Sequence, residues 1–260
     1  MRTISREAAY IKINRRGIVE AVRLLLALAQ VPYEDCRYAS SAAGQGFGVD
    51  AIYGRDKKEG HFRANMNSLP VLIVLDDGNE WRLGQSGAIL RFLAAKHEKF
   101  GINDFERAQI DAILEHIRDI QQKWYRSKQR PSRFCESSSF TDALKACLST
   151  TTSPHRETDK LSFLDIDLPG LLETLESAIP HNNPPWLVGS EASVADVALY
   201  HLLGTPETLI MGMTASFFDG DRDRVRASLA KAPRLQASVD AFSQLDDIQR
   251  WETLRPETFA

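Results

Sequence analysis

Cysteine is scarce in this chain. Its 260 residues include only Cys36, Cys135 and Cys147. These three form no close metal-binding spacing, and one of them would stay unpaired in any disulfide scheme. Reduced thiols in a cytosolic protein are the simpler account of such a set. The sequence therefore predicts neither a metal centre nor a disulfide framework.

Long apolar runs and a strong charge of one sign are also missing. No stretch approaches the roughly 18 apolar residues of a membrane span, and residues 1–7 lack the apolar core of an export signal. The formal net charge of −3 gives no reason to expect a polyanion or a membrane surface as the main partner. We therefore expect a cytoplasmic protein that binds neither nucleic acid nor membranes.

The composition that is present suits a globular protein of two small domains. Hydrophobic residues make up 43% of the chain and charged residues 26%, which is ordinary usage. Residues 97–104 are polar and contain a glycine, and a long helical pattern through Ile110, Ile117 and Trp124 follows them. We place the domain boundary near residue 98, with a first domain at 1–97 and a second at 105–260.

Residues 65–93 hold the most informative unit of the first domain. Pro70 begins the apolar run 71–75, so it suits the start of a strand, and a cis peptide bond after Leu69 is plausible there. Ser86 precedes an apolar helical pattern and is a preferred N-cap residue. A helix N-terminus favours a carboxylate. The unit is therefore either a binding site for a peptide-like anion or a capped helix after an ordinary hairpin.

The elements before this unit complete a recognisable order. Residues 8–14 predict a strand, residues 18–29 a helix and residues 31–38 a second strand, followed by a glycine-rich stretch at 40–61 that we expect to be irregular. A strand, a hairpin partner and a helix then follow. The order indicates a mixed sheet covered by helices.

At this point the sequence resembles the glutathione transferase family. Residues 16–28 look like the first helix of that family, and Leu69-Pro70 and residues 85–90 match two further motifs at the expected separation. The resemblance implies a thioredoxin-like first domain with the element order βαβαββα. It also implies an all-helical second domain, glutathione as a co-substrate rather than a cofactor, and a homodimer.

The second domain carries a further signature. Ser193 and Asp196 predict a capping box at the start of a helix, which the family uses as a folding signal, so we assign them a structural role. Helices are expected at 105–128, 168–179 and 193–203, with shorter ones through Trp251. Residues 127–163 are polar, lack a family counterpart and predict an insertion.

This sequence departs from the family's pattern at the catalytic position. Glutathione's thiol is mostly protonated at neutral pH, so a transferase must stabilise the thiolate. In the tyrosine-type sigma, mu and pi classes the donor is a hydroxyl four residues before the Arg of an Arg-Gly pair. Counting back from Arg16 leads to Lys12. Lys12 would act by charge and Asn14 through its amide, whereas Tyr10 would act only if the strand were shifted or the substrate lay differently. The alternative is that none of them acts.

The family's glutathione-binding positions can be assigned to residues of this sequence more directly. The backbone of Leu69, directly before Pro70, would pair with the cysteinyl part of glutathione. Gln85 and Ser86 would hold its γ-glutamyl carboxylate. Asp111 falls where dimeric members place an acid that reaches the ligand of the neighbouring subunit. The stretch before Leu69 lacks the tryptophan that usually meets the glycyl carboxylate. The substitutes there are Lys58, Lys57 and His61, with Phe62 in place of the ring.

The second substrate is the least determined part. Residues that would line an apolar pocket for a small hydrophobic electrophile are Ile18, His116, Ile120, Trp124 and Tyr125. Two function classes remain open. One is an enzyme that conjugates glutathione to such electrophiles, and the other is a protein of the same fold that serves as a binding or structural module.

Overall fold

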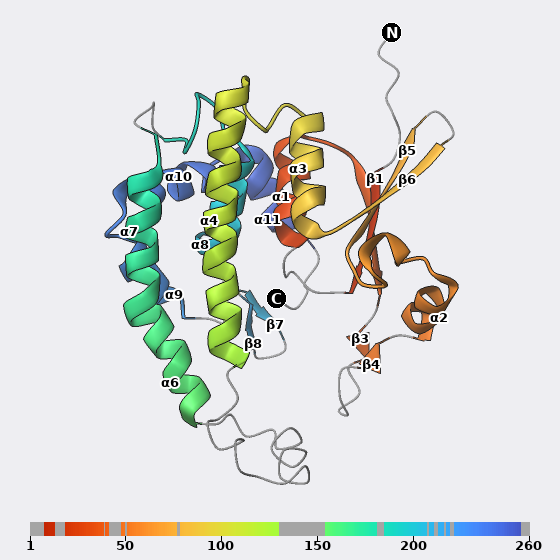
Figure 1. The fold of residues 1–260 in the computed structure, drawn as a ribbon, viewed down its shortest axis with the longest axis horizontal. Helices are drawn as coiled ribbons and strands as arrows, with labels where there is room; N and C mark the ends of the chain where they lie inside the picture. Colours follow the sequence, from red (N-terminus) through yellow and green to blue (C-terminus); the bar gives the residue numbers. More distant parts are fainter. Residues whose placement is uncertain are drawn as a thin grey trace.

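The fold is taken from a computed structural model (Figure 1). It describes residues 8–13, 19–38, 40–41, 48–49, 51–76, 79–129, 154–180, 185–206, 208–210, 213–215, 217–218 and 221–255. Asn14 and Ile18 lie outside these ranges. For the strand that holds Tyr10 and Lys12, the structure describes the backbone alone.

The first domain is built on a four-stranded sheet in the order β2-β1-β5-β6. Strand β1 (Ala8–Ile13) runs parallel to β2 (Tyr33–Tyr38) and antiparallel to β5 (Val71–Asp76), and β5 forms a hairpin with β6 (Asn79–Gly84). A parallel pair needs a crossover, which α1 (Glu20–Leu28) supplies. The predicted thioredoxin-like fold is confirmed.

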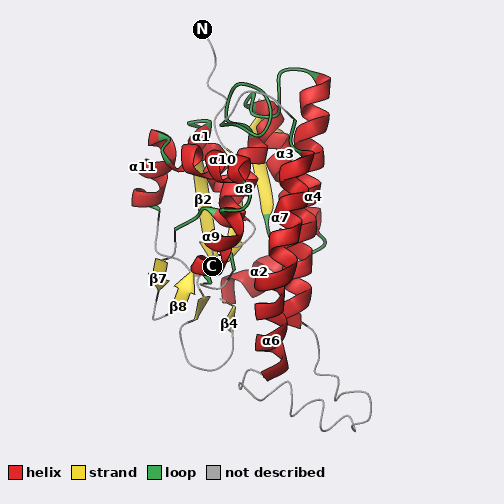
Figure 2. Ribbon diagram, turned by 90° about the vertical axis from the view of Figure 1, so that its left-hand side faces the viewer, coloured by secondary structure: helices red, strands yellow, loops and turns green. Residues whose placement is uncertain are grey.

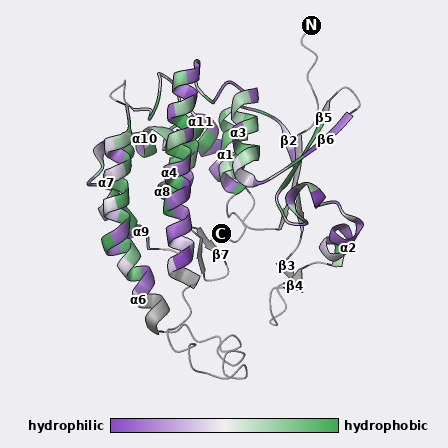
Figure 3. Cartoon of the chain, viewed as in Figure 1, coloured by the Kyte–Doolittle hydropathy of each residue, from purple (hydrophilic) through white to green (hydrophobic). Residues whose placement is uncertain are grey.

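The two faces of the sheet bury different partners. Leu72 and Val74 of β5 belong to the main core with α1 and α3 (Ser86–Lys96), whereas Val71 and Ile73 pack with Phe62 on the other face. This alternation follows from the two-residue period of a strand. Helices α1 and α3 are mostly hydrophobic in Figure 3 because they are the elements that cover the first face.

The stretch at 40–61 is not irregular throughout. It contains α2 (Ala51–Glu59) and the short strand pair β3 (Ser40–Ser41) and β4 (Gly48–Val49), and η2 (Arg63–Asn65) follows it. Helix α2 buries none of its residues, so its sequence lacks the apolar period by which helices are recognised. The local pattern therefore missed α2, whereas the βαβαββα order implied by the resemblance contains it.

The second domain is dominated by helices. Helix α4 (Asp104–Gln129) stands upright beside a long rod made of α6 (Pro154–Ser162), the π-helical η4 (Phe163–Asp167) and α7 (Leu168–Ala178) (Figure 2). Among the described residues of this domain, the other α-helices are α8 (Val194–Leu203), α9 (Arg222–Leu229), α10 (Pro233–Ser243) and α11 (Asp246–Leu254). The helices predicted at 105–128, 168–179 and 193–203 are confirmed as α4, α7 and α8.

Two details of the second domain differ from the expectation. A small hairpin of β7 (Thr208–Ile210) and β8 (Met213–Ala215) interrupts the helices. The predicted insertion at 127–163 is helical at both ends, since α4 continues to residue 129 and α6 occupies residues 154–162. The rest of that insertion lies outside the described residues.

The buried helix α8 ties the domains together. Its residues from Val194 to Leu202 are all buried, and it contacts both α4 and α1. Ser193 Oγ accepts the Ala195 N–H at 3.2 Å, and Asp196 accepts the Ser193 N–H at 2.9 Å. The predicted capping box is therefore confirmed, and its role is structural.

Candidate functional site

The start of α3 has an unusual backbone. Gln85 adopts φ 67° and ψ 113° and is the N-cap residue, with no side-chain capping hydrogen bond. Ser86 is the first helical residue, so the prediction that Ser86 caps the helix is wrong by one position. A non-glycine residue with positive φ is uncommon, and such residues cluster at binding sites. The helix N-terminus itself still offers a favourable place for an anion.

The peptide bond between Leu69 and Pro70 is cis, as the sequence suggested. Pro70 is buried directly before β5, and Leu69 packs against the cluster of Tyr38, Phe62 and Val71. The Leu69 backbone therefore lies at the start of β5. Since β6 ends directly before Gln85 and pairs with β5, the two predicted halves of the site belong to neighbouring strand ends.

A cleft of about 620 Å³ lies at the start of α3, between α3, α4 and α8. Three predicted residues, Gln85, Ser86 and Asp111, line it together. Its other polar lining includes Arg91, Glu115, Arg118, Gln121, Gln122 and His201. The structure thus brings the γ-glutamyl-binding candidates together in a polar, charged cleft.

Arg91 organises the charges of this cleft, and the sequence reasoning did not select it. Its Nε donates to Asp111 Oδ1 at 2.5 Å, and its Nη2 donates to Glu115. Burial alone would lower the pKa of the Arg91 guanidinium, but the two carboxylates raise it above its usual value. Asp111 is thus paired within its own chain. An arginine five residues inside a helix gave no signal, because its partners lie on another helix.

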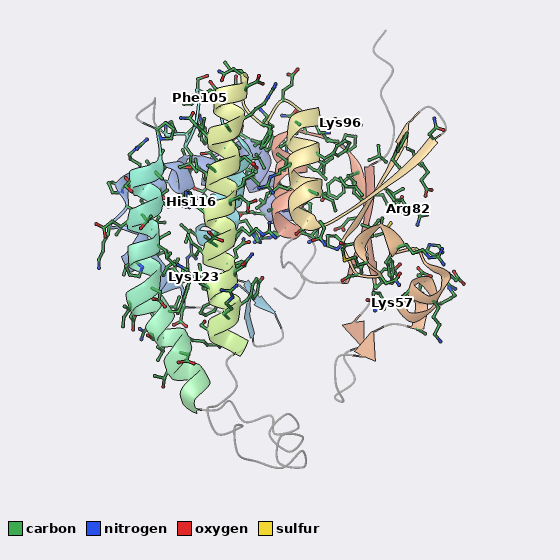
Figure 4. All side chains as sticks on the ribbon, viewed as in Figure 1. Lys57, Arg82, Lys96, Phe105, His116 and Lys123 are labelled. Carbon is green, nitrogen blue, oxygen red and sulfur yellow. The ribbon has the colours of Figure 1, made fainter. Side chains whose placement is uncertain are left out.

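The candidates for the glycyl carboxylate lie elsewhere. Lys57 and Lys58 are exposed in the last turn of α2, on the opposite side of the sheet from α4, where Figure 4 shows Lys57. His61 Nε2 lies 3.3 Å from Glu59. Phe62 is fully buried and stacks on Tyr53 at 5.2 Å between ring centroids. The expectation that Phe62 presents a ring to the ligand is therefore wrong, because its ring fills the core.

Two of the thiol-activating candidates, Tyr10 and Lys12, lie on β1. Tyr10 is paired with Asp35 of β2 and Leu72 of β5, and Lys12 is paired with Arg37 of β2. Both therefore sit on an inner strand of the sheet. Asn14 follows the described part of that strand. The roles of these three residues stay predictions.

The residues expected to line the second-substrate pocket divide into three groups. Ile120 and Trp124 are 2% and 0% exposed, and Trp124 packs on Phe163 and Phe218, so their assignment to a pocket is wrong. Tyr125 does line the cleft, whereas His116 is exposed on α4 and does not (Figure 4). Burial separates the core residues from those that line the cleft. The sequence does not show it, because an apolar side chain on a helix has the same pattern in a core and in a pocket.

Two negative findings apply to the described part of the chain. No group of three or more histidine, cysteine, aspartate or glutamate side chains there is arranged to hold a metal ion. Within the same residues, no helix combines the length and the apolar character that crossing a bilayer requires.

Known proteins match this chain over both domains. Residues 140–255 match the family model described as glutathione S-transferase, C-terminal domain. Glutathione S-transferase 2 of Gallus gallus is 27% identical over 239 residues, covering 92% of this chain and 82% of its own. Both matches are to glutathione S-transferases, so this chain is similar to that family over both domains. The sigma-class transferase of Fasciola hepatica shares the fold, with a TM-score of 0.67 at 18% identity and coverage of 97% and 98%.

A second solved transferase bears on assembly. The structure titled as monomeric Na-GST-3, from the hookworm Necator americanus, has a TM-score of 0.64 at 22% identity and covers 97% of this chain and 99% of its own. At this identity the likeness concerns the fold alone. The same fold thus occurs in a protein described as monomeric, so the fold alone does not determine how this chain assembles.

Proposed function

We propose that this protein conjugates the thiol of glutathione to small hydrophobic electrophiles. The proposal rests on one observation: Gln85 and Ser86 line the same cleft, and Leu69 lies at the start of the neighbouring strand. The relatives with matching sequences are named glutathione S-transferases, which supports the same class of reaction.

Binding would use the backbone as much as the side chains. The γ-glutamyl carboxylate would lie at the N-terminus of α3 against Gln85 and Ser86, where unpaired N–H groups and the helix dipole favour an anion. The Leu69 backbone would pair with the cysteinyl part of the ligand. Lys58 would attract the glycyl carboxylate by charge, and this is the weakest of the assignments because Lys58 does not line the cleft.

The chemical step requires a thiolate. A group on β1 would stabilise the deprotonated sulfur, which then attacks the electrophilic carbon and forms the carbon–sulfur bond. The leaving group departs, or the adduct takes up a proton from solvent. Lys12 would act through its positive charge, Tyr10 through its hydroxyl and Asn14 through its amide.

We also propose a cytoplasmic homodimer. In that assembly Asp111 of one protomer would reach the ligand bound by its partner, and it would exchange its pairing with Arg91 for that contact. Asp111 retains about half of its side-chain exposure, 49%, in the single chain, so it remains accessible for such an exchange. Light scattering of the purified chain measures the assembly directly.

The proposal is tested by calorimetry and a pH titration. We expect glutathione to bind with a Kd between about 1 μM and 1 mM, and no heat at millimolar ligand would contradict both the site and the enzyme. The thiolate absorbance of bound glutathione is then followed against pH in the parent and in Lys12→Ala, Tyr10→Phe and Asn14→Ala. The variant that loses the lowered thiol pKa identifies the activating group. A parent that binds glutathione without lowering its thiol pKa would instead support a non-catalytic binding module.

A further inference from the structure

Asn65 is a buried polar residue in the loop before β5, and the family motifs do not include it. It ends η2 and is 5% exposed. A buried amide needs a hydrogen-bond partner, because its desolvation is otherwise unfavourable. Its Oδ1 accepts the backbone N–H of Gln85 at 3.0 Å, across 20 residues of sequence. This bond joins the loop to the start of α3.

The bond acts on a residue with an uncommon backbone conformation. Gln85 has φ 67° and ψ 113°, a conformation that persists only where its surroundings hold it. By accepting the Gln85 N–H, Asn65 fixes the plane of the peptide between Gly84 and Gln85. That plane sets the direction in which the Gln85 side chain and the first turn of α3 leave the sheet.

Gly84 lets the loop come this close. A Cβ added at Gly84 would lie 2.3 Å from the Ala64 carbonyl oxygen and 2.6 Å from the Asn65 Cβ. Both distances are shorter than non-bonded atoms allow, so any side chain there would push the loop and the strand end apart. The absence of a side chain at residue 84 is thus a condition for the bond between Asn65 and Gln85.

Asn65 is itself held from both sides. Its N–H donates to the Phe62 carbonyl at 2.9 Å, and its carbonyl accepts the Ser68 N–H at 2.9 Å. Phe62 anchors the loop through its buried ring, and Ser68 directly precedes Leu69. One residue therefore connects the backbone of Leu69 with the backbone of Gln85, which are the two halves of the glutathione site.

We propose that Asn65 is a positioning residue for glutathione recognition: it orients Gln85 and the N-terminus of α3 toward the γ-glutamyl carboxylate. The inference rests on the proposed function, since it assigns a ligand group to that same cleft. Asn65 acts through Gln85. Its loss should weaken the hold on the γ-glutamyl carboxylate, while the reacting sulfur is held by other groups.

The test compares two ligands in several variants. Calorimetry measures the Kd for glutathione and for an analogue in which the γ-glutamyl α-carboxylate is replaced by hydrogen. In the parent we expect glutathione to bind at least about tenfold more tightly, because charge-assisted hydrogen bonds are among the stronger ones. In Asn65→Ala we expect this preference to fall roughly fivefold to tenfold, with Kd for the analogue nearly unchanged. A general loss of folding would weaken both ligands alike.

Kinetics and a matched control complete the design. In Asn65→Ala we expect KM for glutathione to rise with kcat unchanged, because the lost contact is equal in the ground state and transition state. Asn67→Gly changes an exposed asparagine of the same loop with φ 57° and should keep the parent's preference. If Asn65→Ala does not fold, Asn65→Ser carries the same comparison. A parent without glutathione binding overturns the proposed function, whereas a parent that binds and an Asn65 variant with the full preference overturn this inference alone.

Discussion

Gln85 has an unusual backbone conformation for a residue of the site. Its positive φ comes from its place between a strand end and a helix start, and the bond from Asn65 holds it there. Gln85 and Ser86 were predicted from a family motif. The unusual backbone of Gln85 was not, because glutamine has no intrinsic preference for positive φ. The hydrogen bond from the neighbouring loop supports this conformation.

A charge placed at Gln85 tests the anion site at this scale. Gln85→Glu keeps the size of the side chain and adds a negative charge where we expect a carboxylate, so glutathione binding should weaken at least about tenfold. Calorimetry at low and high salt measures the Kd for glutathione, and the difference in Kd between the parent and Gln85→Glu should shrink as the salt concentration rises. The matched control is Gln121→Glu, which adds the same charge on the α4 side of the cleft. Equal losses in the two variants would refute a specific anion site at α3.

Single residues also show where sequence reasoning fails. Phe62 and Trp124 were assigned to ligand contacts and are core residues instead. An aromatic ring on a loop or helix carries the same pattern whether it meets a ligand or a neighbouring helix. Its partners decide, and these are Tyr53 for Phe62 and Phe163 with Phe218 for Trp124.

At the scale of elements, the start of α8 is the part best predicted by local sequence. Asp196 is fully buried and accepts hydrogen bonds from the N–H groups of Leu187 and Ser193 and from the hydroxyls of Ser193 and Ser238. The capping box was readable because its partners are three residues apart. The bonds to Leu187 and Ser238 join α8 to other segments and were not readable. Helix α2 gave no local signal because none of its residues is buried, and only the element order implied by the resemblance included it.

The capping box leads to a ranked prediction. Ser193→Ala should lower the free energy of unfolding by about 1 kcal/mol, the usual contribution of a capping side chain. Asp196→Ala should cost more, about 3 kcal/mol, because it leaves several buried donors unpaired. Denaturant unfolding measures both. Ser190→Ala changes an exposed serine of the preceding turn and should stay within about 0.5 kcal/mol. A larger loss for Ser193→Ala than for Asp196→Ala would contradict this account.

At the scale of the whole molecule, a buried ion network joins the end of the chain to the first domain. Arg23 of α1 bonds Glu20 at 3.1 Å and Asp35 of β2 at 3.1 Å. Trp251 of α11 donates to Glu20 at 3.2 Å, and Arg255 lies 3.5 Å from the same carboxylate. The Arg23, Glu20 and Arg255 side chains are at most 6% exposed. The C-terminal helix is therefore fastened to α1.

The network predicts a pH dependence of stability. Burial alone would raise the pKa of Glu20, but Arg23, Arg255 and the Trp251 hydrogen bond lower it below its usual value. The charged carboxylate thus stabilises the folded state fully above the unfolded pKa of about 4.3, and this contribution is lost as the pH falls through the folded pKa. Glu20→Gln should cost about 3 kcal/mol at pH 7.

Unfolding free energies between pH 7 and pH 3 check this prediction. The difference between the parent and Glu20→Gln should be constant down to about pH 4.3 and then shrink. The control is Glu173→Gln, an exposed glutamate of α7, which should follow the parent at every pH. A difference that stays constant across the whole range would show that Glu20 contributes through packing rather than charge.

The sequence by itself determined the capping box and made a cis bond after Leu69 plausible, and its motifs implied the thioredoxin-like order through a family resemblance. Each of these rests on neighbouring residues or on a short motif, whose physics is local. Tertiary structure decided which aromatic residues are core, that Arg91 pairs with Asp111, and that Asn65 holds Gln85. These depend on segments far apart in the chain. These contacts form only once the chain has folded and brought those segments together.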